Sequence, residues 1–145
     1  MNNYKNILLA TNLQPDNQKV GDAAKAFAER IGAKLSIVHV FGYLPMLYGA
    51  NEFAIPLNGD IETTAIKQAQ LSLTKEGERL GIPAANHILE RGDTREGLVA
   101  LINKSHFDML IMGSHEHHGL GFFGSATNSL LHAMPCDILA IRLAA

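Results

Sequence analysis

Short apolar runs alternate along the chain with longer segments in which apolar residues recur every three or four positions. A short apolar run predicts a strand that is buried on both faces, whereas the longer spacing predicts a helix with one buried side. The predicted strands are Asn6–Thr11, Lys34–Val40, Asn86–Glu90, Met109–Met112 and Asp137–Leu143. Strands that alternate with helices in this way predict a doubly wound α/β fold, with a five-stranded parallel sheet and helices on both faces.

Capping residues mark the ends of the predicted helices. The first helix is expected to end at Gly32, because glycine favours the left-handed conformation just beyond a helix. Asp60 is the expected N-cap of the second helix. Asp93 and Glu96 have the spacing of a capping box, which predicts the start of the third helix. Residues 41–59 follow no period, and we interpret them as a long surface loop.

A glycine-rich loop follows the fourth predicted strand and leads into the last predicted helix. Gly113 is expected to end the strand, and Ser125 is the expected N-cap of the helix. The loop between them contains Gly119, Gly121 and Gly124. Bare backbone amides and the positive end of the helix dipole would face a ligand here, so the segment predicts an anion site. The structural alternative is that these glycines only permit tight turns.

The spacing of these glycines does not by itself identify a phosphate-binding motif. Residues 119–124 match G-x-G-x-x-G by letter, but a dinucleotide fold has these glycines directly after its first strand. The segment from Gly119 to Ser125 also lacks the lysine of a phosphate loop. Both observations argue against a dinucleotide-dependent enzyme and against a kinase or NTPase.

The sequence predicts neither a metal site nor catalytic residues. His115, His117 and His118 surround Glu116, but Gly119 occupies the position of the second histidine in H-E-x-x-H. Three imidazoles so close together in one loop cannot easily point at one ion. The chain also contains no G-x-S-x-G elbow. We therefore expect that the protein is not an enzyme, and that it has at most a slow ATPase side activity if it binds a nucleotide.

Composition limits the remaining function classes. The chain of 145 residues is expected to form a single domain over residues 1–145. A formal net charge of -2 with mixed signs argues against a nucleic-acid partner. Cys136 is the single cysteine and is expected to be buried and inert. The apolar run Ile7–Ala10 is too short for an export signal or a membrane span, so we expect a cytoplasmic protein without membrane contact.

The chain resembles a universal stress protein over essentially its full length. The residues that carry the resemblance are the opening NILLATN, Val38–Val40, Met112–His115, Gly124-Ser125 and Pro135–Arg142. The resemblance implies the strand order 3-2-1-4-5 and a role in the stress response. It also implies a ligand crevice between strands one and four, at the topological switch point where open α/β sheets bind ligands.

The resemblance implies a motif that is typical of the family members that bind adenine nucleotides. This motif is a glycine, two residues, a second glycine, nine residues, and then a glycine followed by serine or threonine. An aspartate at the end of the first strand usually precedes it. Gly113 matches the first glycine, and Gly124 with Ser125 matches the last pair. Glu116 replaces the second glycine, and Asn12 replaces the aspartate. The interval from Gly113 to Gly124 is also two residues shorter than in the motif. A carboxylate repels phosphate and an amide holds magnesium less well, so these departures disfavour a triphosphate.

Two functions therefore remain open. One is a sensor or regulator that binds an adenine nucleotide (AMP, ADP or ATP), with or without magnesium; AMP or ADP would tolerate the shorter loop better. The other is a protein-interaction module of the same family that binds no nucleotide. The expected nucleotide-binding residues are Ala10, Asn12, Val40, Met112, Gly113, His115, Glu116, Gly124, Ser125 and Ala126.

The fifth strand is expected to lie at an edge of the sheet. It is apolar and free of proline, and such an edge is usually paired or covered in a native protein. The resemblance implies that it pairs with the fifth strand of a second copy about a twofold axis, which gives a homodimer. The residues expected at that interface are Asp137, Leu139, Ile141 and Leu143.

Overall fold

A parallel sheet forms the centre of the computed structural model, which describes residues 3–41, 58–114 and 131–143. The strands are β1 (Asn6–Ala10), β2 (Lys34–Phe41), β3 (His87–Arg91), β4 (Met109–Ser114) and β5 (Asp137–Arg142). They form a five-stranded sheet in the order β3-β2-β1-β4-β5, and every neighbouring pair is parallel. The predicted fold class and strand order are therefore confirmed.

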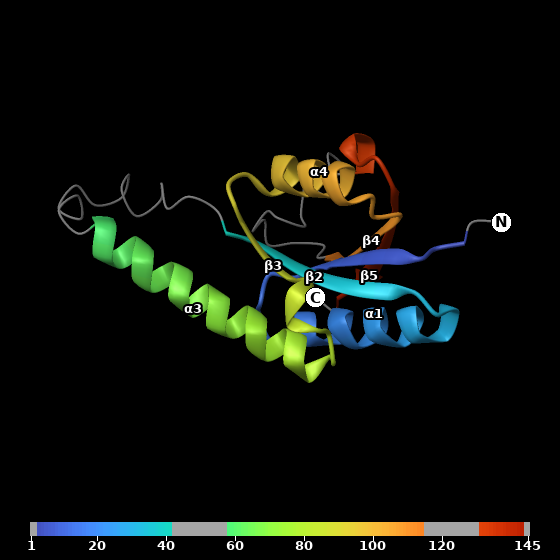
Figure 1. Cartoon of the computed structure of the whole chain (residues 1–145), viewed down its shortest axis with the longest axis horizontal. Helices are drawn as coiled ribbons and strands as arrows, with labels where there is room; N and C mark the ends of the chain where they lie inside the picture. Colours follow the sequence, from blue (N-terminus) through green and yellow to red (C-terminus); the bar gives the residue numbers. More distant parts are fainter. Residues whose placement is uncertain (1–2, 42–57, 115–130, 144–145) are drawn as a thin grey trace.

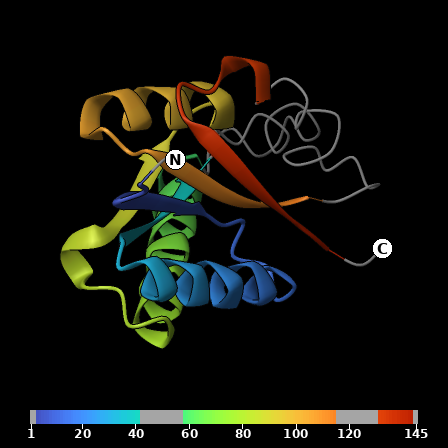
Figure 2. The ribbon, with the colours of Figure 1, turned by 90° about the vertical axis from the view of Figure 1, so that its right-hand side faces the viewer.

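Helices cover both faces of this sheet (Figure 1). The helices α1 (Asn17–Ile31) and α3 (Asn58–Arg79) lie on one face, and α4 (Thr94–Ser105) lies on the other (Figure 2). The short 3-10 helix η2 (Ala84–Asn86) leads into β3, and residues 131–133 are also helical. No helix among the described residues combines the length and the apolar character that a membrane crossing requires.

Each face of the sheet has its own hydrophobic core. Ile7 and Leu9 of β1 pack with residues of α1 and α3 in one core, which we call the α1 core. Leu8 and Ala10 pack with residues of α4 in the other, which we call the α4 core. All four side chains are at most 2% exposed. Burial on both faces explains why the strand is a continuous apolar run and does not alternate with polar residues.

The predicted helix ends at Gly32 and Asp93 have the expected capping geometry. Gly32 follows α1 with a φ of 72°, and its N–H donates to the carbonyl of Glu29. Asp93 precedes α4, and its carboxylate accepts a hydrogen bond from the N–H of Glu96 at 3.0 Å. These caps set where the chain enters and leaves each helix.

Two local predictions are wrong. Asp60 is not the N-cap of α3, because the helix begins at Asn58. Asp60 is the third residue of α3, and acidic residues are also favoured in the first turn of a helix because they interact with the positive end of its dipole. Gly113 does not end β4, because its backbone pairs with Ile141 of β5 and the strand continues to Ser114. Of the loop predicted over 41–59, residues 42–57 lie outside the described part of the chain.

Candidate functional site

The carboxyl ends of β1 and β4 lie side by side in the middle of the sheet. β1 pairs with β2 on one side and with β4 on the other. The strand order runs outward from β1 through β2 to β3 in one direction and from β4 to β5 in the other. Open α/β sheets bind ligands at the carboxyl ends of the strands where the order reverses in this way. The topology thus creates the predicted switch point.

The predicted nucleotide-binding residues divide into two groups. Those at or just beyond the ends of β1, β2 and β4 are Ala10, Asn12, Val40, Met112 and Gly113. Those that lie outside the described residues are His115, Glu116, Gly124, Ser125 and Ala126. The histidine cluster that continues to His118 also lies outside them.

Three of the described site residues have buried side chains. Ala10, Val40 and Met112 belong to the α4 core and are 2%, 6% and 0% exposed. Their side chains therefore hold the strand ends together. A ligand at this edge of the sheet would meet the backbone ends of these strands and not these side chains.

Gly113 is required by packing inside the subunit. A Cβ atom built on it would lie 2.9 Å from Cδ1 of Leu143 and 3.0 Å from Cγ2 of Val20. Real Cβ atoms essentially never approach another heavy atom to less than 3.0 Å. The Cα hydrogen of Gly113 that a side chain would replace thus points toward α1 and the end of β5. Packing within the fold is by itself a sufficient reason for a glycine at this position.

Asn12 lies in a loop whose polar side chains bond to its own backbone. Oδ1 of Asn12 accepts from the N–H of Gln14 at 2.8 Å, and Oγ1 of Thr11 accepts from the N–H of Leu13 at 3.0 Å. The N–H of Asn12 donates to Oδ1 of the buried Asn17 at 3.1 Å. The carbonyl oxygen of the Asn12 side chain is thus used inside the loop, and its Nδ2 group can still donate to a ligand.

His39 of β2 connects this loop to the centre of the sheet. Its Nδ1 lies 2.8 Å from the carbonyl oxygen of Thr11, which requires a proton on Nδ1. Burial of the ring lowers the pKa of His39, and the hydrogen bond to Thr11 opposes that shift. The neutral ring is therefore the form that the folded state favours. The sequence places His39 at a strand end, but it gives no signal for this contact with Thr11.

The lowered pKa of His39 predicts a loss of stability in mild acid. The unfolded chain binds a proton at the usual histidine pKa of about 6.5, whereas the folded chain binds it only at lower pH. The free energy of unfolding is thus expected to fall as the pH drops through 6.5, until the folded-state pKa is passed. Urea unfolding across this range should show a weaker pH dependence for His39→Gln than for the wild type. Equal pH dependence would contradict this role of His39.

A pocket of about 440 Å³ lies between the loop after β1 and the helix α3. The residues that line it include Thr11, Leu13, Pro15, Ser72, Lys75 and Arg79. None of the predicted nucleotide-binding residues lines it. Threonine, asparagine and proline in TNLQP indicate a turn after β1. The sequence gives no signal that α3 packs opposite this turn, so the pocket was not predicted.

Neither a metal site nor a reactive thiol is present among the residues that the structure describes. No group of three or more histidine, cysteine or acidic side chains within them could hold a metal ion. Cys136 is half-buried and packs against the α4 core. Burial, together with the carboxylates of Asp137 and Asp108, raises the pKa of the Cys136 thiol to about 11. The thiol is therefore protonated near neutral pH and is a poor nucleophile.

Curated relatives match the chain over nearly its whole length. Universal stress protein A homolog 1 of Coxiella burnetii is 36% identical over 139 residues, which cover 95% of this chain and 96% of the relative. Universal stress protein A homolog 2 of the same organism is 29% identical over 145 residues, which cover 99% and 98%.

Solved structures share the fold. The universal stress protein UspA from Lactobacillus plantarum has a TM-score of 0.74 at 16% identity, over 98% of this chain and 100% of that chain. A universal stress protein in complex with cAMP has a TM-score of 0.64 at 18% identity, over 99% and 100%. The model of the universal stress protein family matches residues 3–142. The chain therefore belongs to the universal stress protein family.

Proposed function

We propose that this protein binds an adenine nucleotide across the carboxyl ends of β1 and β4 and acts as a sensor or regulator in the stress response. The observation that carries the proposal is the reversal of strand order between these two strands. A universal stress protein of the same fold is known in complex with cAMP, which supports an adenine nucleotide as the class of ligand.

The chemistry of the proposed site residues favours a nucleotide with few phosphates. Nδ2 of Asn12 offers a neutral donor at the site. Oδ1 of Asn12 accepts from the N–H of Gln14, and as a neutral amide oxygen it holds magnesium less well than a carboxylate would. The phosphates would depend on the backbone around Gly124 and on the hydroxyl of Ser125, and Glu116 would repel a third phosphate. We therefore favour AMP or ADP over magnesium-ATP.

Replacing Gly124 with valine tests the proposed phosphate contact. AMP and ADP should raise the midpoint of thermal unfolding of the wild type, because a ligand that binds only the folded state stabilises it. The Gly124→Val variant should keep the wild-type midpoint without nucleotide and show no rise with it, because the valine side chain would block close approach of the phosphates. A nucleotide-induced rise as large as that of the wild type would sink the assignment of Gly124.

A matched variant reports on the charge of Glu116. Glu116→Gly should increase the midpoint shift that ATP causes more than the shift that AMP causes, because removal of a like charge matters most to the triphosphate. An unchanged ATP shift would mean that this carboxylate does not face the phosphates.

The second candidate function is a protein-interaction module that binds no nucleotide. The observation that favours it is the packing of Gly113 against Val20 and Leu143, which accounts for a glycine at this position without any ligand. Under this alternative, no adenine nucleotide would change the unfolding midpoint of the intact protein. The same measurement therefore separates the two candidates.

We also propose a homodimer that forms through β5. This strand is the last in the sheet order and lies at its outer edge (Figure 2). Its residues Leu139 and Ile141 pack partly against the α1 core, and Leu143 is 3% exposed within the subunit. The contact would thus use mainly the free backbone edge of β5 and the exposed parts of Asp137, Leu139 and Ile141.

A further inference from the structure

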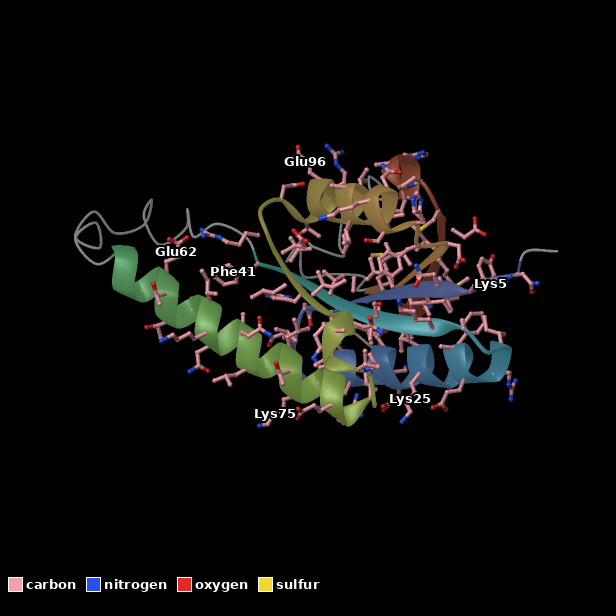
Figure 3. The ribbon with its side chains drawn as sticks, viewed as in Figure 1. Lys5, Lys25, Phe41, Glu62, Lys75 and Glu96 are labelled. Atoms are coloured by element: carbon pink, nitrogen blue, oxygen red, sulfur yellow. The ribbon has the colours of Figure 1, made fainter. Side chains whose placement is uncertain are left out.

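The pocket between the loop after β1 and α3 is separate from the proposed nucleotide site. Its volume of about 440 Å³ is in the usual range for small-molecule sites. Leu13 and Pro15 form an apolar wall from the loop side, and Ser72 and Lys75 come from α3. Both elements lie on the face of the sheet that carries α1, where Figure 3 labels Lys75 on α3. Gln18 of α1 also lines the pocket, so the pocket joins the loop after β1 and the start of α1 to α3, which is far away in the sequence.

The apolar wall is held in a conformation that its sequence does not favour. Leu13 has a φ of 64°, which is uncommon for a bulky residue other than glycine. The bond from its N–H to Thr11 and the bond from Gln14 to Asn12 keep the loop in this shape. Leu13 also packs partly against the α1 core. Strained residues of this kind are often found where a loop is pre-organised for a ligand.

Of the two basic side chains that line the pocket, Arg79 is bound by other groups of the protein and Lys75 is available to bind an anion. Arg79 donates from Nε and Nη2 to both carboxylate oxygens of Glu76 at 2.8 and 2.7 Å. It also donates to Asp22 at 2.7 Å and to the carbonyl of Gln18 at 3.3 Å. The guanidinium is thus occupied by groups of the protein. Lys75 is exposed and forms no ion pair among the described residues, so its ammonium can bind an anion.

We propose that this pocket binds a small organic monoanion, a carboxylate attached to an apolar or aromatic body. The body packs against Leu13 and Pro15, and the carboxylate interacts with the ammonium of Lys75 and the hydroxyl of Ser72. A dianion or a polyphosphate fits less well, because the carboxylate of Glu76 also lines the pocket and repels additional negative charge. The proposal does not depend on nucleotide binding at the strand ends.

Benzoate and its uncharged analogue benzamide test this proposal in an NMR titration of the full chain. Benzoate should shift the backbone amide signals of residues 13, 14, 16–18 and 72–79 in a saturable way. It should bind roughly two- to fivefold more tightly than benzamide, which is the contribution of an exposed ion pair. Shifts centred on other residues, or no saturable shift in the millimolar range, would overturn the proposal.

A pair of lysine variants isolates the charge. Lys75→Gln should remove the preference for benzoate over benzamide. Lys67→Gln changes an exposed lysine of the same helix that does not line the pocket, and it should keep the preference. Because both lysines are exposed, neither change should unfold the protein. A preference that survives in Lys75→Gln would mean that this lysine does not hold the anion.

Discussion

Replacing Gly113 with valine is expected to lower the free energy of unfolding by about 1–3 kcal/mol, the usual range for overpacking a filled core. A side chain here would meet Leu143 at 2.9 Å and Val20 at 3.0 Å. These two neighbours are only 3% and 0% exposed, so neither can move aside without disturbing the core. Urea unfolding followed by circular dichroism measures the loss.

A double variant shows whether the loss arises from this contact. Val20→Ala removes the Cγ2 atom that a new side chain at position 113 would meet. The double variant Gly113→Val with Val20→Ala should therefore be more stable than the sum of the two single losses predicts. Strictly additive losses would contradict the packing role of Gly113.

Replacing Ala140 with proline is expected to convert the proposed dimer into a folded monomer. The N–H of Leu143 donates to the carbonyl of Ser114 in β4 at 3.1 Å. Because backbone groups alternate in direction along a strand, the N–H of Ala140 points away from β4, toward the free edge. Proline removes this N–H but no bond of the sheet within the subunit. Sedimentation velocity should show half the wild-type mass.

Proline at the neighbouring position is the matched control. The N–H of Leu139 faces β4, so Leu139→Pro should weaken the subunit itself and lower its unfolding midpoint. Ala140→Pro should leave that midpoint close to the value of a wild-type monomer. A wild-type protein that stays monomeric at micromolar concentration would refute the dimer.

The fold could be predicted from the sequence because its main signals are local. The run Ile7–Ala10 is apolar at every position, and the structure buries it between two helical layers. Gly32 and Asp93 have residue types that suit one backbone geometry, and both adopt it. Strand order follows less directly from such signals, and the resemblance to the family supplied it.

Features that depend on contacts between distant segments could not be predicted. The close approach of Val20 and Leu143 to Gly113 joins three elements, so a glycine that matches a ligand motif also has a packing role. The hydrogen bond between His39 and Thr11 joins β2 to the loop after β1. The pocket beside Lys75 needs α3 to lie against that loop. No local pattern encodes these distances.

Calorimetric titration of the wild-type protein with AMP, ADP and ATP tests the proposed nucleotide site most directly. We expect saturable heat with one nucleotide per subunit, tighter binding of AMP or ADP than of magnesium-ATP, and loss of that heat in Gly124→Val. The absence of saturable heat with all three nucleotides in the millimolar range would contradict nucleotide binding at the ends of β1 and β4.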